Sequence, residues 1–240
     1  MTKNESAAEA ETAQVDPSVS RRERAVARSL YSARARAESR FQRFLDAALE
    51  LMDEGEPGRD FTVQEVVDRS GQSLRLFYQY FGGKHELLLA LFEESVRSTT
   101  EYLRDKITHE DGPLGRLHCF VVEYYRLCRP TDGGESAMNG RAPFMAEFAQ
   151  QLLTEHPNEA ARVFAPLVTL FEEVLEAAES AGAVRTGPSH GPIVGVVLEA
   201  IMFNSFSSTI GGLSVRTQGE GSAEDLWDLI FYGIGTRSPS

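Results

Sequence analysis

Apolar residues recur along most of the chain at the spacing of an amphipathic helix. The first clear stripe follows Arg40 and contains Phe41, Phe44, Leu45, Ala48, Leu49 and Met52. These positions fall on one face of a helix with about 3.6 residues per turn. The same spacing predicts later helices over residues 84–106, 114–128, 143–153, 157–181, 191–211 and 223–234. No segment alternates as a strand does, so we expect an all-α fold of about nine helices.

Two short helices are predicted between the first stripe and residue 84. Thr62 and Glu65 have the spacing of a capping box, which predicts a helix start at residue 62. Gly71 is expected to end that helix, because glycine tolerates the left-handed turn that follows many helices. Ser73 can cap a second helix over residues 74–81. Two short helices joined by a tight turn predict a helix-turn-helix.

The second short helix is rich in aromatic residues, and its spacing divides them between two faces. Phe77 and Phe81 are expected to be buried, with Tyr78 at the edge of their face and Tyr80 pointing outward. An outward Tyr80 beside Arg75 and Gln79 could donate hydrogen bonds to phosphates or bases. Spacing alone leaves a second reading open, in which Tyr80 only covers a hydrophobic edge.

Charge is distributed unevenly along the chain. The net charge is −12, yet residues 21–43 contain eight Arg and two Glu, a local charge of +6. Residues 20–37 are rich in Ala and Arg and have high helix propensity, but they carry little apolar surface. Residues 1–19 have the composition of a disordered segment. The basic segment suggests an acidic partner such as nucleic acid, while a solvated basic helix face is the alternative.

Other features narrow the class of protein. No apolar run is long enough for a membrane span, and the polar N-terminus is unlike a secretory signal, so we expect a cytoplasmic protein. No Gly-rich phosphate loop or nucleophilic Ser motif is present, so we predict neither an enzyme nor a cofactor. Cys119 and Cys128 lack metal-ligand spacing and the histidines are scattered, so no metal site is predicted.

The run FTVQEVVDRSGQSLRLFYQYFGGKHELLLALFEE, residues 61–94, resembles the DNA-binding domain of TetR-type transcriptional repressors. The resemblance lies in the capped helix, the Gly turn, the aromatic-rich recognition helix, and a Lys before a Leu-rich helix. The matching residues are Gly71, Ser73, Phe77, Tyr78, Phe81 and Lys84. Tyr80 departs from the family, which usually has His there, and Leu76 replaces a small or polar residue.

The resemblance implies roles for individual residues in DNA binding. Thr62 and Lys84 would contact phosphates, and Phe77 and Phe81 would be structural. The major groove would be faced by Ser73, Leu74, Arg75 and Leu76, with Tyr78, Gln79 and Tyr80 beside them. Arg75 suits direct reading of guanine, because guanidinium can bond to it in a bidentate manner. The basic segment of residues 21–43, here called the basic arm, includes Arg34, Arg36 and Arg40. It could follow phosphates or enter a minor groove.

The resemblance also implies a domain layout. Residues 1–37 would be a flexible, Arg-rich extension, residues 38–86 the DNA-binding domain, and residues 87–240 an effector-binding and dimerisation domain. The last two helices would pair with their copies in a homodimer on a near-palindromic operator. An apolar or aromatic effector would release the DNA. Its pocket candidates are His118, Phe120, Tyr124, Tyr125, Phe144, Phe148, Phe171, Phe203 and Asn204.

Two other functions stay open at this point. A transcriptional activator would have the same domain layout, since repression is only the usual outcome in the family. A helical interaction protein that no longer binds DNA is the other alternative. The sequence does not identify the operator or the effector.

Overall fold

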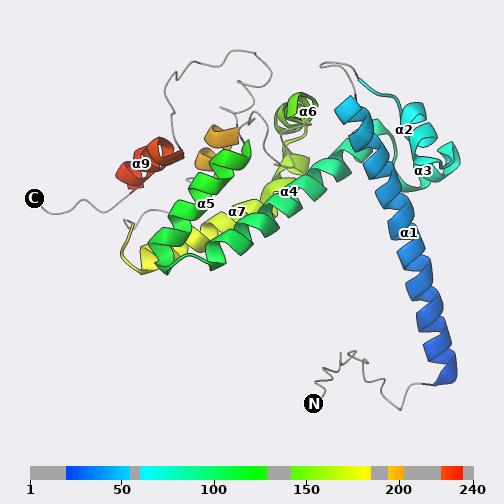
Figure 1. The fold of residues 1–240 in the computed structure, drawn as a ribbon, viewed down its shortest axis with the longest axis horizontal. Coiled ribbons are helices and arrows are strands. Elements are labelled where there is room, and N and C mark those ends of the chain that lie inside the picture. The colour runs from blue at the N-terminus through cyan, green and yellow to red at the C-terminus, as the bar shows by residue number, and fades with distance from the viewer. Residues whose placement is uncertain (1–19, 55–59, 129–141, 185–193, 203–222, 235–240) are drawn as a thin grey trace, which may run out of the picture. The chain divides into compact units, whose positions relative to one another are not determined.

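The computed structural model describes residues 20–54, 60–128, 142–184, 194–202 and 223–234. Every regular element within these ranges is a helix, which confirms the predicted all-α class. Residues 194–202 form one helix (Figure 1), and the others are α1 (Arg21–Glu54), α2 (Val63–Ser70), α3 (Leu74–Tyr80), α4 (Lys84–Thr108), α5 (Gly112–Cys128), α6 (Ala142–Glu155), α7 (Pro157–Ser180) and α9 (Ala223–Ile234).

The chain divides into two compact units, residues 1–43 and residues 44–240, and α1 runs through the boundary. In the first unit, α1 begins at Arg21 because Ser20 caps it. The Ser20 hydroxyl accepts a hydrogen bond from the Glu23 amide at 3.2 Å, and the Glu23 carboxylate accepts one from the Ser20 amide at 2.8 Å. The basic segment is therefore helical and continuous with the helix predicted to follow Arg40.

The second unit begins with a small core under α2 and α3. Phe44 of α1 and Phe77 of α3 are fully buried, and their rings meet edge to face at 5.5 Å. Phe81 is also buried and contacts Phe44 with a centroid distance of 6.0 Å. Such aromatic pairs stabilise a core beyond the area that they bury. This small core fixes α3 against the end of α1.

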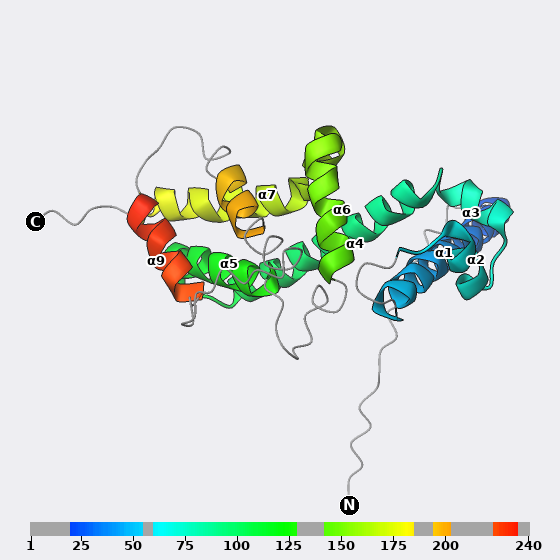
Figure 2. The same ribbon diagram turned by 90° about the horizontal axis from the view of Figure 1, so that it is seen from above.

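The larger part of the second unit is built on α4, α5 and α7, which pack against one another. Helix α6 lies across α4 and α7, and α9 packs on α5 (Figure 2). Phe120 and Phe171 stack at 4.6 Å between α5 and α7. Among the described residues, Thr100 is the only buried side chain with a polar group besides Cys119, Tyr124 and Trp227, and its hydroxyl donates to the Val96 carbonyl at 2.7 Å.

The predicted helices agree closely with those observed, because their apolar stripes and caps are local features. Pro157 occupies the first turn of α7, and Gly182 follows that helix with a φ of 70°. The predicted helix over 191–211 is described only from 194 to 202, and the predicted loop after Pro130 lies outside the described residues. In the described ranges, no helix is both long and apolar enough to cross a bilayer.

Candidate nucleic-acid interface

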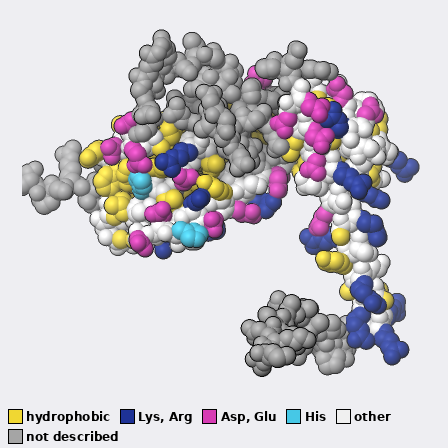
Figure 3. Space-filling model, in the orientation of Figure 1, with side chains coloured by type: hydrophobic (Ala, Val, Ile, Leu, Met, Phe, Trp, Pro, Cys, Tyr) yellow, Lys and Arg dark blue, Asp and Glu magenta, His cyan; other side chains and the backbone are white. Residues whose placement is uncertain are grey.

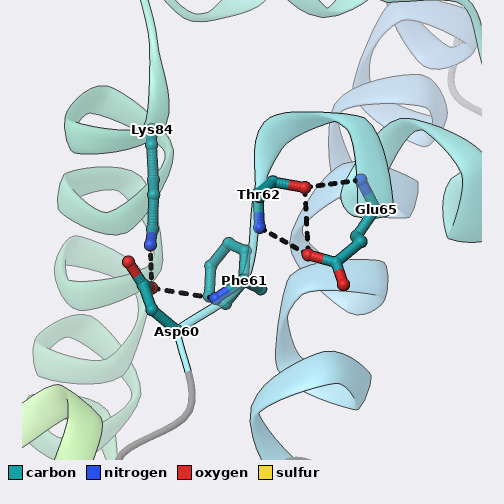
Figure 4. Close-up of polar contacts among 5 residues, drawn as sticks. All are labelled: Asp60, Phe61, Thr62, Glu65 and Lys84. Carbon is teal, nitrogen blue, oxygen red and sulfur yellow. Dashed lines mark hydrogen bonds and ion pairs between the residues drawn. The ribbon is translucent and has the colours of Figure 1, made fainter.

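The start of α2 is fixed by the predicted capping box (Figure 4). The Glu65 amide donates to the Thr62 hydroxyl oxygen at 3.2 Å, and the Thr62 amide donates to the Glu65 carboxylate at 2.7 Å. The Thr62 hydroxyl also donates to that carboxylate at 2.9 Å. Thr62 is exposed, so a phosphate could reach it, but its hydrogen-bonding groups are already engaged with Glu65.

The turn between α2 and α3 has the conformation that its sequence predicts. Gly71 has a φ of 65° and a ψ of 25°, a left-handed conformation that favours glycine. Ser73 then caps α3, because its hydroxyl accepts a hydrogen bond from the Leu76 amide at 3.2 Å. These two local devices set the direction in which α3 leaves the turn.

The aromatic residues of α3 divide differently from the prediction. Tyr78 is the outward tyrosine, with 56% of its surface exposed, whereas Tyr80 is half-buried and lies 6.3 Å from the Phe44 ring. The helix ends at Tyr80, and Phe81 has an extended backbone with φ −133° and ψ 133°. The buried face is therefore centred on Phe77 alone. Tyr80 is then about 60° from that centre and Tyr78 about 100°, because each residue turns a helix by about 100°.

The solvent face of α3 presents most of the predicted base contacts. Leu74 is 42% exposed, Arg75 and Gln79 are exposed, and Leu76 is half-buried. Arg75 forms no hydrogen bond or ion pair with any other residue in the described part of the chain. A guanidinium held on a short, capped helix in this way is available to an external acceptor.

Lys84, at the start of α4, is held within the domain (Figure 4). Its ammonium group forms an ion pair with the Asp60 carboxylate and lies over the Phe61 ring, 4.5 Å from the ring centroid. Its side chain is only 25% exposed. The predicted contact of Lys84 with a DNA phosphate would therefore have to compete with Asp60.

The basic arm is a run of exposed arginines along α1 (Figure 3). Arg36 and Arg40 are exposed, and Arg34 forms an ion pair with Glu38 at 2.7 Å, one turn further along the helix. An exposed pair of this kind contributes little stability, so Arg34 can exchange Glu38 for a phosphate at small cost.

The helix-turn-helix and the helices on either side of it resemble a known family. Residues 44–91 match the family of bacterial regulatory proteins described as the tetR family. The chain carries a TetR-type helix-turn-helix domain. The match spans α2, α3, the C-terminal part of α1 and the start of α4. No curated protein sequence matched the chain.

Solved structures extend the likeness of fold beyond the TetR-type domain. The transcriptional regulator FadR from Bacillus subtilis in complex with stearoyl-CoA has a TM-score of 0.63 at 15% identity, covering 81% of this chain and 99% of its own. FadR from Thermus thermophilus in complex with lauroyl-CoA has a TM-score of 0.60 at 17% identity, covering 83% and 97%. The fatty acid degradation regulator FadR from Bacillus halodurans has a TM-score of 0.59 at 16% identity, covering 79% and 93%. At these identities the likeness shows a shared fold.

The nine residues expected to line an effector pocket all lie outside the TetR-type domain, and they differ from one another in burial. Phe120, Tyr124 and Phe171 are buried, and burial raises the pKa of Tyr124 well above its ordinary value. Phe148 is buried beside Phe92 at 6.2 Å. His118 forms a hydrogen bond with Glu224 at 2.7 Å, and Tyr125 is half-buried. The side chains of Phe144, Phe203 and Asn204 lie outside the part of the chain that the structure describes. All nine remain predictions.

One cluster in the second unit escaped the sequence analysis. His85 bonds to Glu159 with its Nε2 atom 2.9 Å from the carboxylate, and the rings of His85 and His156 lie 4.7 Å apart. The hydrogen bond from His85 lowers the pKa of Glu159. His85 is 74 residues from Glu159, so only the fold brings them together. The one local signal was the spacing of His156 and Glu159, which places both at the start of α7.

Proposed function

We propose that this protein is a DNA-binding transcriptional regulator, and that it acts as a ligand-responsive repressor. The observation that carries the proposal is α3, a capped helix with an exposed Arg75, held on a buried pair of phenylalanines within a TetR-type domain. A helix so presented can enter the major groove, where its side chains can contact base edges. A transcriptional activator would have the same domain layout, so repression, as opposed to activation, is itself part of what we propose.

A homodimer through the last two helices is part of this proposal. In the parts of these helices that the structure describes, three large apolar side chains are exposed: Val196 at 67%, Leu229 at 73% and Tyr232 at 82%. Exposed apolar surface on neighbouring turns is typical of protein interfaces. A two-fold dimer would carry two recognition helices, and we expect a near-palindromic operator with half-sites about 34–36 Å apart.

The effector is proposed to be apolar or aromatic. The described interior is nearly free of polar side chains, which supports an apolar ligand. Two FadR structures of similar fold hold stearoyl-CoA and lauroyl-CoA, and the acyl chains of these ligands are apolar. Binding would shift α4, which connects the DNA-binding domain to α5 and α7, and would favour a state with low operator affinity.

The proposed layout keeps the boundaries expected from the sequence, at residues 37 and 86. We propose that the protein acts in the cytoplasm and catalyses no reaction. Neither described thiol is activated for nucleophilic attack, because burial raises the pKa of Cys119, and that of Cys128 to about 12. A nucleophilic cysteine needs the opposite shift.

A mobility-shift assay with the DNA upstream of the protein's own gene tests the function. The full chain should retard this fragment in preference to a scrambled fragment of equal length. Lauroyl-CoA should release the DNA, whereas coenzyme A without an acyl chain should not. Retardation of neither fragment at low salt would overturn the DNA-binding proposal, and equal retardation of both would overturn sequence-specific binding. Release by neither compound would overturn the acyl effector alone.

A further inference from the structure

Three side chains with metal-binding atoms meet where α4 and α7 begin. His85 is the second residue of α4, His156 directly precedes α7, and Glu159 lies in the first turn of α7. One ligand atom from each lies within 4.8 Å of the other two. Within the described ranges, no other group of three His, Cys, Asp or Glu side chains converges in this way.

The donor set has the chemistry of a transition-metal site. Two imidazole nitrogens and one carboxylate oxygen bind zinc at about 2.0–2.2 Å, and tetrahedral zinc sites with three protein ligands keep a fourth position open. Ligand atoms in such a site lie about 3.3–3.6 Å apart. The present separations therefore need shifts of about an ångström, and all three side chains are only half-buried, which leaves room for them.

The surroundings hold the three residues in place. The His85 ring packs on Phe148, with a centroid distance of 5.6 Å, and Phe148 is buried. The His156 carbonyl accepts hydrogen bonds from the amides of Glu159 at 2.9 Å and Ala160 at 3.0 Å, which fixes the backbone at the start of α7. Residues that pack around metal ligands in this way orient them and raise affinity.

A hydrogen bond between two helices, without a metal, would also explain the contact between His85 and Glu159. A second His–Glu pair in the chain serves as a comparison. His118 of α5 bonds to Glu224 of α9 at 2.7 Å, with side-chain exposures of 37% and 53%. The His85 and Glu159 side chains have exposures of 39% and 29%. The difference is the third ligand, because the pair of His118 and Glu224 has no second imidazole among the described residues.

We propose that His85, His156 and Glu159 bind a divalent transition-metal ion, with zinc as the first candidate, and that the ion ties the start of α4 to the start of α7. The imidazole-rich donor set favours zinc, nickel or copper over magnesium or calcium. A second consequence, for DNA binding, rests on the proposed function. His85 is adjacent to Lys84, so the ion would bias the position of the helix that leads out of the DNA-binding domain.

Zinc titration of the metal-free full chain, followed by isothermal calorimetry without DNA, tests the site. The wild type should bind one Zn²⁺ per chain, and His85→Asn and His156→Asn should each weaken binding by about tenfold or more. His118→Asn is the matched control and should bind as the wild type does. Co²⁺ should give the visible absorption of a tetrahedral complex in the wild type and not in His156→Asn.

Several results would overturn the site. The site is ruled out if the wild type does not bind zinc stoichiometrically. It is also ruled out if both His85→Asn and His156→Asn bind zinc as the wild type does, or if His118→Asn loses as much affinity as they do. Melting curves with EDTA identify a variant that fails to fold, and Glu159→Gln then replaces it. Because calorimetry uses no DNA, its outcome is independent of the proposed function. Zinc that binds but leaves operator affinity unchanged would overturn the bias on α4 alone.

Discussion

The aromatic residues of α3 and Phe81, which caps it, have different roles although they are close in sequence. Phe77 is fully buried against Phe44, whereas Tyr78 is mostly exposed. Tyr80 lies between these extremes, with its ring near both Phe44 and Phe81. Stability and DNA contact should therefore separate when these residues are changed one at a time.

Phe77→Ala should lower the free energy of unfolding by about 3–5 kcal/mol, because it leaves a cavity in a small core. Tyr78→Ala, the control on the exposed side, should change it by about 0.5 kcal/mol or less. Tyr80→Ala should fall between them, since it removes a half-buried ring. Urea denaturation followed by circular dichroism measures all three. Similar losses for Phe77→Ala and Tyr78→Ala would contradict this division.

For individual residues, the sequence predicted correctly those features whose interacting partners are close together in the chain. The Thr62 and Glu65 capping box was confirmed, because both partners are three residues apart and need no tertiary context. The outward direction assigned to Tyr80 was wrong, because it assumed that the helix continues through Phe81. The cluster of His85, His156 and Glu159 was missed, because only the packing of α4 against α7 assembles it.

At the scale of elements, α1 is the helix that periodicity describes least well. Its apolar stripe is confined to the C-terminal part, where Phe44, Leu45, Ala47 and Ala48 are buried. The N-terminal part is helical through its Ala and Arg content and the Ser20 cap, with no buried face of its own. We propose that the exposed arginines of this part of α1 contact DNA phosphates.

Deleting residues 1–37 should weaken DNA binding and flatten its dependence on salt, because fewer phosphates are neutralised. Fluorescence anisotropy over about 50–200 mM salt measures both effects. The double variant Arg34→Gln and Arg36→Gln keeps helix propensity while removing charge, so it should show part of the same change. Unchanged affinity of the deletion at every salt concentration would rule the arm out as a DNA contact.

At the scale of the whole molecule, helix 194–202 and α9 each bury one face and expose apolar residues on another. Val194, Leu198, Ile201 and Met202 face the interior, while Val196 is 67% exposed. Trp227 of α9 is buried and contacts the His118 ring at 5.0 Å, while Leu229 and Tyr232 are exposed. Sequence periodicity identified these helices as apolar, but it could not separate the side that packs within the chain from the side that stays exposed.

Leu229→Glu should convert a dimer into a monomer, because it places a charge on the exposed apolar face. Light scattering after size exclusion should then give the chain mass of 26.5 kDa instead of about twice that value. Leu114→Glu is the matched control, since Leu114 is 37% exposed on α5, outside the proposed dimer helices. A wild-type protein that is already monomeric would contradict the proposed dimer.

The central claim is that α3 reads DNA through its exposed face. Fluorescence anisotropy with the upstream fragment and with a scrambled fragment tests it most directly, comparing the wild type with Arg75→Ala and with Arg116→Ala, an exposed arginine of α5. Arg75→Ala should lose about 1–3 kcal/mol of binding free energy on the upstream fragment and much of its preference over the scrambled one, with an unchanged melting temperature. Arg116→Ala should match the wild type. Equal affinity and equal preference in Arg75→Ala and the wild type would contradict the account.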